Sequence, residues 1–434
     1  AVFDYSWERL SPEEGLALAH CSLFQGGFMA AAATAVARVP MALLLALTQK
    51  SLLRAVGNGR FDMHELIRHF AAEKLPTLPI DSHAVQTAHA RYYAHFIQQR
   101  ANQLENETAV LREIQAEMSN IRAAWQWATP TNQLEIMRQA LPGLTSFYRL
   151  TGAFREAHTL LGQTLRQLAT LPPTVEARLL LGQLSAAQSY FVQRVVNLND
   201  AAPLAQTAVT IGEELNDAPL QVIGHVRLAA IRFGEGQIGE SEKHSQLALA
   251  LARQHDILPL EQAQSLRYLG QIATIHGDYA AARTHYQASL TLAQQIGSRP
   301  HEGRLLKDLG IIEWRHGAYG RANEYLQAGL ANVRATGDRP TEAEILKNLG
   351  VVAWFLGDYA QAADAYQQSL AIYQDIGDQA GASDTLNNLG LLAWGQGRYE
   401  QSAAYYQQSL RIKEQIGDRL QMGIMLGNLG IMSR

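Results

Sequence analysis

Residues 347–377 read KNLGVVAWFLGDYAQAADAYQQSLAIYQDIG, and the pattern of this stretch returns every forty residues in the second half of the chain. A Leu-Gly pair recurs at Leu269-Gly270, Leu309-Gly310, Leu349-Gly350, Leu389-Gly390 and Leu429-Gly430. A Gly-x-Tyr triplet recurs at Gly277-Tyr279, Gly317-Tyr319, Gly357-Tyr359 and Gly397-Tyr399. A loop glycine recurs at Gly297, Gly337, Gly377 and Gly417. A period of this length is typical of stacked units that cannot bury their apolar faces alone, so it predicts a solenoid.

Small and large residues alternate along the second half of each repeat. Twelve residues after Gly350 comes the small Ala362, followed by the bulky Tyr366 and then by Ser369. Steps of four and three keep these residues on one face of a helix. Gly350 is predicted to lie where a neighbouring helix crosses closely, and Gly357 to end the first helix in a left-handed conformation. Each repeat is therefore predicted to be a pair of interlocking antiparallel helices.

This pattern resembles the tetratricopeptide repeat, in its version with an extended loop. The resemblance is strong over residues 260–434 and weaker over 134–259, where degenerate copies of the triplet occur. It implies an all-α superhelical solenoid over 134–434, with about seven hairpins and one terminal helix, that binds partners and carries no chemistry. The predicted hairpins are 134–170, 174–216, 217–257, 259–298, 299–338, 339–378 and 379–418, and residues 419–434 would start an eighth.

Residues 1–75 predict a winged-helix domain. Ser11-Pro12-Glu13-Glu14 is typical of a helix start. Short helices are expected at about 29–37 and 40–49, and a helix at about 64–75. Between them, β-prone segments at 51–56 and 60–63 flank Gly57-Asn58-Gly59, which predicts a hairpin. Residues 76–133 are interpreted as a helical linker, with helices at about 83–106 and 110–128.

The N-terminal part also resembles the winged-helix segment of STAND ATPases, which are signal-transducing NTPases of the NB-ARC type. The resemblance is carried by LFQGGF at 23–28, LLLALTQKSLL at 43–53, FDMHEL at 61–66 and AAEKL at 71–75, and EMSNIRAAWQWA at 117–128 is similar to the helix that follows. Many proteins of that family are bacterial transcription regulators with tetratricopeptide sensors. Met63-His64-Glu65 matches the family's Met-His-Asp motif, with Glu65 replacing the aspartate. The resemblance implies that His64 reaches the β-phosphate of ADP held by an upstream nucleotide-binding domain.

No catalytic or metal-binding pattern stands out, and we do not expect this chain to be an enzyme. The chain has no G-x-x-x-x-G-K-[S/T] motif. No cofactor is therefore expected in this chain, although ADP or ATP would belong to the intact protein. His64 and His69 miss the H-E-x-x-H spacing of a zinc site by one residue. His83, His89 and His95, spaced by six, are predicted to be solvated.

A stripe on the first helices of three repeats is the candidate partner site. A Lys or Asn, a branched or leucine side chain and a tryptophan lie at i, i+4 and i+7, which places them on one helix face. The resemblance implies that these positions line a concave groove that binds a protein or peptide segment, with asparagines pairing to its backbone. Packing of the tryptophans between repeats remains the alternative. The predicted site residues are Lys307, Ile311, Trp314, Lys347, Asn348, Val351, Trp354, Asn388, Leu391, Trp394 and Asn428.

Composition narrows the functional class. The 434 residues are too many for one core and carry a net charge of −4, which argues against a dedicated nucleic-acid surface. Met41–Leu47 is apolar, so DNA binding is not expected.

The single cysteine, Cys21, is predicted to be buried in a cytoplasmic protein. Arg38 and Pro40 interrupt the apolar stretch 28–47, which predicts two short helices and no membrane span.

The leading interpretation is the regulatory and sensory region of a STAND-type ATPase. In this interpretation the repeats bind an inducer or partner and the winged helix locks an upstream nucleotide switch. The chain starts without methionine and stops just after a Leu-Gly pair, so it is expected to be a piece of a longer protein. The alternative is a stand-alone tetratricopeptide adaptor without a switch, and a DNA-binding regulator that acts through the wing ranks third.

Overall fold

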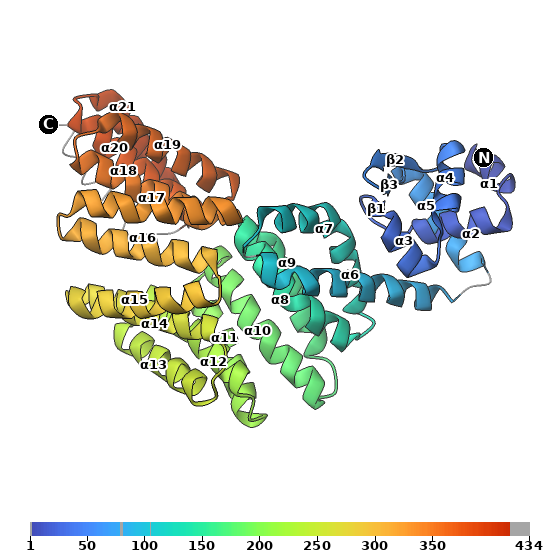
Figure 1. Cartoon of the computed structure of the whole chain (residues 1–434), viewed down its shortest axis with the longest axis horizontal. Helices are drawn as coiled ribbons and strands as arrows, with labels where there is room; N and C mark the ends of the chain where they lie inside the picture. Colours follow the sequence, from blue (N-terminus) through green and yellow to red (C-terminus); the bar gives the residue numbers. More distant parts are fainter. Residues whose placement is uncertain (1, 79–80, 105, 417–434) are drawn as a thin grey trace. The chain divides into compact units, whose positions relative to one another are not determined.

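The computed structural model describes residues 2–78, 81–104 and 106–416, which divide into two compact units. The first unit contains the described residues up to Leu104 together with Ala109–Phe147 and Leu160–Leu180. The second contains Tyr148–Thr159, the described residues from Leu181 onward and a short segment before Ala109. The architecture is an all-α repeat array with a small N-terminal α/β region, which confirms the predicted fold class (Figure 1).

The N-terminal region combines short helices with a three-stranded antiparallel sheet of order β1-β3-β2. Helix α2 contacts α3, α4 and α5 and is the centre of the helical packing. The elements are α1 (Val2–Glu8), α2 (Pro12–Cys21), β1 (Phe28–Met29), α3 (Ala30–Ala37), α4 (Met41–Gln49), β2 (Arg54–Gly57), β3 (Arg60–Asp62), α5 (Glu65–Lys74), the 3-10 helix η1 (Leu75–Thr77), α6 (Ser82–Leu104) and α7 (Thr108–Ala128).

Local sequence signals set the boundaries of these elements. The Ser11 hydroxyl accepts a hydrogen bond from the Glu14 N–H (3.2 Å), and the Glu14 carboxylate accepts one from the Ser11 N–H (2.8 Å), so the two residues form a capping box at α2. The predicted hairpin is confirmed, because β2 and β3 are joined through Gly57, Asn58 and Gly59, all at positive φ. Glycine and asparagine adopt that conformation with the least strain.

Strand β1 is a feature that the sequence analysis missed. We predicted residue 29 to be helical, but Phe28 and Met29 pair with β3 instead. The Phe28 ring lies against Phe24 and Phe61, with centroids 4.4 and 6.3 Å away. Aromatic packing therefore fixes this strand, and a two-residue strand is too short to show an alternating pattern in the sequence.

Hydrogen bonds join α7 to the α/β region within the first unit. Arg60 of β3 forms an ion pair with Glu117 of α7. The buried Asn120 accepts a hydrogen bond from the Gln25 N–H (2.6 Å) and donates one to the Gly27 carbonyl (2.8 Å). The side chain of one α7 residue thus satisfies two backbone groups of the loop before β1, which fixes the loop on the helix.

The prediction that the histidines of α6 are solvated is wrong for His89. His89 is buried beside Phe24 and Tyr93, with ring centroids 5.4 and 4.8 Å away, and its burial lowers its pKa to about 4. The face of α6 that carries His89 packs against another element, which spacing within one helix cannot reveal. The buried state of Cys21 is confirmed, and burial raises the pKa of its thiol to about 12.

The apolar stretch 28–47 forms two separate helices after its first residues, as predicted. Helices α3 and α4 meet at a bend of 115°. Among the described helices, none is by itself long and apolar enough to cross a membrane, and this bent pair meets the requirement only by the length and composition of its two helices together.

From Leu134 the described chain consists of consecutive helices joined by short loops. From α11 on, each helix packs against the next, and the first helices of successive hairpins also contact one another: α12 with α14, α14 with α16, α16 with α18, and α18 with α20. These first helices therefore form the inner face of the array. The helices are α8 (Leu134–Thr151), α9 (Phe154–Leu168), α10 (Val175–Val195), α11 (Leu198–Glu214), α12 (Ala218–Gly234), α13 (Ile238–Gln254), α14 (Pro259–Ile275), α15 (Tyr279–Gln295), α16 (Arg299–Arg315), α17 (Tyr319–Thr336), α18 (Arg339–Phe355), α19 (Tyr359–Asp375), α20 (Gln379–Gly395) and α21 (Tyr399–Ile416). The helix predicted over 419–434 lies outside the described residues.

In the four described Leu-Gly pairs, the glycine lies where the two helices of a hairpin cross. A Cβ atom added at Gly350 would lie 2.5 Å from the ring of Tyr366, closer than real Cβ contacts allow. The predicted close crossing is therefore confirmed. Three residues further along α19, the Ser369 hydroxyl donates a hydrogen bond to the Ala343 carbonyl of α18 (2.8 Å). The same crossing occurs at Gly270 with Tyr286, Gly310 with Leu326, and Gly390 with Tyr406.

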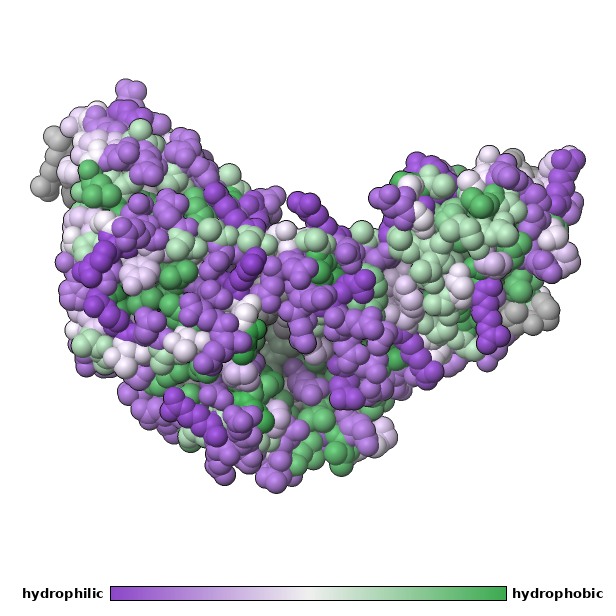
Figure 2. Space-filling model, in the orientation of Figure 1, coloured by the Kyte–Doolittle hydropathy of each residue, from purple (hydrophilic) through white to green (hydrophobic). Residues whose placement is uncertain are grey.

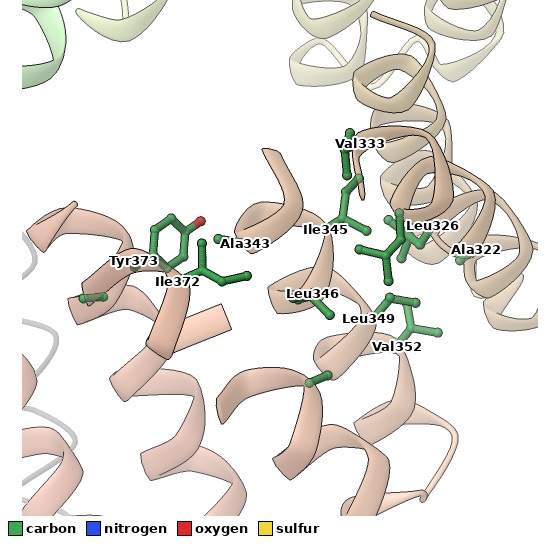
Figure 3. Packing of buried hydrophobic residues seen from close by; sticks show 13 residues of the cluster. Ala322, Leu326, Val333, Ala343, Ile345, Leu346, Leu349, Val352, Ile372 and Tyr373 are labelled. Carbon is green, nitrogen blue, oxygen red and sulfur yellow. The ribbon is translucent and has the colours of Figure 1, made fainter. Parts of the chain in front are cut away.

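Apolar clusters lie between successive helices of the array. In the cluster of Figure 3, Leu326 and Val333 of α17 face Ile345 and Leu349 of α18, and Ile372 of α19 lies on the other side of α18. Each hairpin thus buries one face against its predecessor and another against its successor, as expected of a solenoid.

Within the second unit, the loop between α8 and α9 lies against hairpins that come much later in the chain. A Cβ atom added at Gly152 would lie 3.0 Å from the side chain of Ile376 and 3.6 Å from that of Pro340. Residues at the beginning and near the end of the described array are therefore neighbours, and the inner face is enclosed by the array itself.

Two glycine substitutions test this packing. Gly350→Ala is expected to destabilise the protein by about 1 to 3 kcal/mol, because the new methyl group must displace the Tyr366 ring. Gly320→Ala is the matched control. Gly320 is the exposed second residue of α17, and a Cβ atom added there would have no neighbour within 4 Å. This substitution should stabilise the protein by about 0.5 to 1 kcal/mol. Urea denaturation of both variants measures the difference, and equal midpoints would contradict the proposed crossing.

Candidate functional site

The first helices of six hairpins converge on one small polar cavity in the second unit. Its volume is about 100 Å³. Helices α8, α10, α12, α14, α16 and α18 each contribute to its wall. The lining includes six cationic side chains and two carboxylates: Arg149, Arg194, Arg227, Arg267, Arg304 and Lys307, with Asp338 and Glu344.

Three of the cationic groups are neutralised by carboxylates. Arg267 forms an ion pair with Asp308 of α16. Arg304 lies 2.6 Å from Asp338, the N-cap residue of α18. Lys307 pairs with Glu344, and although burial alone would raise the pKa of Glu344, Lys307 and Arg194 hold it below its usual range. These pairs link adjacent hairpins across the inner face.

Arg194 and Arg227 form no ion pair with a described residue but have aromatic neighbours. The Arg227 guanidinium lies 5.2 Å from the centroid of the Tyr190 ring, and that of Arg194 lies 5.5 Å from Tyr190 and 5.7 Å from Phe154. Such cation–π contacts stabilise a cation without neutralising it. Among the described residues, neither arginine forms an ion pair, so this part of the cavity carries an excess of positive charge.

His301 lines the same cavity and is only 2% exposed. Its Nδ1 atom has no hydrogen-bond partner within the part of the chain that the structure describes. Burial, reinforced by Arg304 and Arg149, holds the pKa of His301 well below its usual range. His301 is therefore neutral near pH 7.

The cationic lining was only partly predicted. The sequence analysis used Lys307 and Lys347, but Arg227 and Arg267 precede them at the same forty-residue spacing. This basic column is a signal that the sequence contains. Arg149, Arg194, Arg304 and His301 occupy other positions, and only the packing of the helices brings them to the cavity.

The polar residues of the predicted stripe lie on the inner helices, but several already have partners. Lys307 is buried and paired, so it is not free to attract a ligand. Lys347 lies 3.9 Å from Asp384. The Asn348 amide donates a hydrogen bond to the Glu344 carbonyl one turn earlier (2.8 Å). Asn388, Ile311, Val351 and Leu391 are half-buried, and Asn428 lies outside the described residues.

The tryptophans of the stripe are not equally exposed. Trp314 and Trp354 are partly buried against the apolar clusters, and their rings lie 5.9 and 5.4 Å from that of Phe355. Trp394 is 47% exposed. The packing alternative therefore accounts for Trp314 and Trp354. On the face seen in Figure 2, hydrophilic residues predominate over the repeats and hydrophobic ones form small separate patches.

A larger cavity of about 880 Å³ adjoins the cationic one in the second unit. The two share Arg194. The larger cavity is lined by the α8–α9 loop, the end of α10, the α19–α20 loop and α21, with apolar side chains such as Val195 and Ile376 beside polar ones. It is large enough for several side chains of a bound segment.

His64 lies in the other unit, at the N-cap of α5. Its side chain is exposed, and its Nδ1 atom accepts a hydrogen bond from the Leu66 N–H (3.3 Å). The neighbouring Met63 is buried, and Glu65 is exposed. Over residues 2–78, 81–104 and 106–416, no group of three or more His, Cys, Asp or Glu side chains is placed to hold a metal ion.

Sequence models of the tetratricopeptide repeat match residues 261–335, 324–375 and 383–416. These are tetratricopeptide repeats. The sequence has no match among proteins of curated function.

Among solved structures, the fold is similar to that of a Rap protein complexed with Competence and Sporulation Factor. The TM-score is 0.55 at 13% identity, over 82% of this chain and 93% of that one. A STAND protein with a tetratricopeptide repeat sensor from Pyrococcus horikoshii aligns with a TM-score of 0.47 at 14% identity, over 99% of this chain and 67% of that one. BtubC from P. vanneervenii aligns at 0.43 and 21% identity, over 51% and 92%.

The different packing of Trp354 and Trp394 can be tested by how much the loss of each side chain lowers the stability of the protein. Trp354→Ala is expected to lower the free energy of unfolding by about 2 to 3 kcal/mol, less than for a fully buried tryptophan, because the indole fills space between hairpins. Trp394→Ala should change it by less than about 1 kcal/mol, since that side chain is largely exposed. Thermal melting of the two variants decides, and equal losses would contradict this assignment.

Proposed function

We propose that the inner face of the tetratricopeptide repeats binds an extended, acidic protein segment. The observation that carries this proposal is the cavity lined by six cationic and two acidic side chains, in which Arg194 and Arg227 form no ion pair with any described residue. Lys347 lies beside the larger cavity, 5.9 Å from the ring of Tyr373, which lines it. The chain as a whole has a net charge of −4, so this local excess of positive charge is opposite in sign to the rest of the molecule. Complementary charge favours both encounter and orientation of an acidic partner.

The shape of the site agrees with a bound protein segment. The cationic cavity shares Arg194 with the 880 Å³ cavity, which is lined by both apolar and polar side chains. Acidic groups of a bound segment would lie near Arg194 and Arg227, and its apolar side chains near Val195 and Ile376. Tetratricopeptide-repeat proteins bind peptide or protein partners, and the Rap protein of similar fold is complexed with a factor.

The second part of the proposal is regulatory: the chain is the sensory region of a STAND-type ATPase, and partner binding is coupled to a nucleotide switch upstream. This part rests on the motif resemblance around Met63-His64-Glu65 and on the exposed position of His64 at a helix N-terminus. The alternative is an adaptor in which the same repeats bind partners without any switch. Both versions share the partner site and differ only in the role of His64.

Peptide selection on the purified chain tests the partner site. Random peptides selected for binding should be enriched in Asp and Glu interleaved with apolar residues. Lys347→Gln should weaken them by about tenfold, the effect of losing one desolvated charge contact. Lys243→Gln is the matched control, because Lys243 is an exposed lysine on α13, a second helix of a hairpin. Selection of basic peptides, or equal binding by both variants, would contradict the proposal.

Nucleotide content tests the switch. In a gene product that carries the nucleotide-binding domain, His64→Ala should reduce the amount of ADP that co-purifies and raise basal activity, since a contact to the phosphate is lost. His69→Ala, which removes another exposed histidine of α5, should leave both unchanged. If His64→Ala retains its ADP, the adaptor alternative is favoured.

A further inference from the structure

We propose that the cavity formed by Arg149, Arg194, Arg227 and His301 is a binding site for a phosphate monoester group. The inference deepens the proposed function, because it names the chemical group that the inner face recognises. It does not require that the ligand be a protein segment. The same chemistry could come from a phosphorylated side chain or from a small phosphorylated metabolite.

The first argument is charge. After the three ion pairs of Arg267, Arg304 and Lys307 are formed, Arg194 and Arg227 form no ion pair with any described residue, although Glu344 acts on Arg194 and Glu261 on Arg227 from a longer distance. Arg149 also lines the cavity and is only 8% exposed, and burial together with Arg304 lowers its pKa to about 10. Clustering like charges is unfavourable unless an anion balances them. An anion bound beside Arg149, Arg194 and Arg227 would relieve this repulsion.

The second argument is geometry. The four side chains come from α8, α10, α12 and α16, so their donors approach the cavity from different helices. A carboxylate is planar and is best satisfied by one or two guanidinium groups in its plane, whereas a tetrahedral oxyanion can accept hydrogen bonds from several directions. The volume of about 100 Å³ is roughly that of three water molecules in the liquid, which suits one compact oxyanion.

The third argument is the free nitrogen of His301. His301 lines the cavity, and its buried Nδ1 atom has no hydrogen-bond partner in the described chain, which is uncommon for a buried polar atom. A bound dianion would offset the repulsion from the arginines, so that His301 could take up a proton and donate Nδ1–H to the ligand. Binding should therefore strengthen as the pH falls. The charged and titratable groups around His301 are Arg149 on α8, Tyr190 and Arg194 on α10, Arg227 on α12, Arg267 and Tyr268 on α14, Arg304 and Lys307 on α16, and Asp338 and Glu344 at α18.

Calorimetry of the full chain with sodium sulfate tests the site, because sulfate is a tetrahedral dianion that does not itself titrate near neutral pH. Native protein should bind sulfate with saturation at physiological salt. Arg194→Gln and Arg227→Gln should each weaken binding by about tenfold or more. Arg253→Gln, an exposed arginine at the end of α13, is the matched control and should have no effect. Because Arg194 is exposed at the helix end, its variant should fold even if the Arg227 variant does not.

The role of His301 has its own readout. Sulfate affinity of the native chain should be severalfold higher at about pH 6 than at about pH 8, with proton uptake seen as a dependence of the binding heat on the buffer. His301→Gln should remove this pH dependence while retaining binding. If the native chain shows no saturable binding, or if succinate binds as tightly as sulfate, the phosphate assignment is overturned.

Two further titrations separate the source of the phosphate and the two proposals. A selected acidic peptide carrying phosphoserine in place of one glutamate should bind at least about tenfold more tightly than O-phosphoserine if the natural ligand is a protein. If the phosphoserine peptide and O-phosphoserine bind with equal affinity, the natural ligand is a small phosphorylated metabolite. Peptide binding without sulfate binding would refute the phosphate site and leave the proposed function standing. Sulfate binding without any selected peptide would refute the proposed peptide-binding function and leave the phosphate site standing.

Discussion

The close crossing of the two helices in each hairpin is the constraint on which the rest of the second unit depends. Gly350 and its equivalents allow the ring or branched side chain of the second helix to reach the backbone of the first. The crossing fixes how each hairpin folds, and the stacking of hairpins then brings successive first helices into contact. Side chains forty residues apart consequently lie on one surface, so a basic residue at one position of the repeat becomes a column of charge.

The charges on that surface are only partly balanced. The ion pairs of Arg267, Arg304 and Lys307 connect neighbouring first helices and support the array. Arg194 and Arg227 form no ion pair with a described residue and lie against aromatic rings instead. A carboxylate in direct contact would balance these guanidinium groups more fully. The arrangement is understandable if the missing negative charge arrives with a partner, and this links the proposed segment and the proposed phosphate group to the same physical cause.

The sequence predicted the features that depend on local pattern, and missed those that depend on which distant surfaces meet. The forty-residue register led directly to the hairpins, to the crossing at Gly350 and to the inner position of Lys307. The Gly57-Asn58-Gly59 turn could equally be predicted from the sequence. The burial of His89 and the strand at Phe28 follow from packing between elements, for which spacing along one helix carries no signal.

The residues of the candidate site likewise include some that the sequence pattern predicts and some that only the packing brings together. Lys347 and its column could be found by period alone, and Arg227 and Arg267 could have been found in the same way. Arg149 and Arg194 belong to hairpins whose sequences have lost the period, so only the fold brings them beside His301. The tryptophans show the converse difficulty, because a helical stripe at correct spacing does not reveal whether the next hairpin covers it.

The contact of Gly152 with Ile376 has a consequence for how such a chain can evolve. Open solenoids tolerate the gain or loss of whole repeats, because each unit contacts only its neighbours. Here the α8–α9 loop lies against the α19–α20 loop, and the wall of the larger cavity includes both. Duplication or deletion of one forty-residue unit between them would break that contact and open the cavity. The repeat number between α8 and α20 is thus held fixed by ring-like closure, and diversification is confined to substitutions within units.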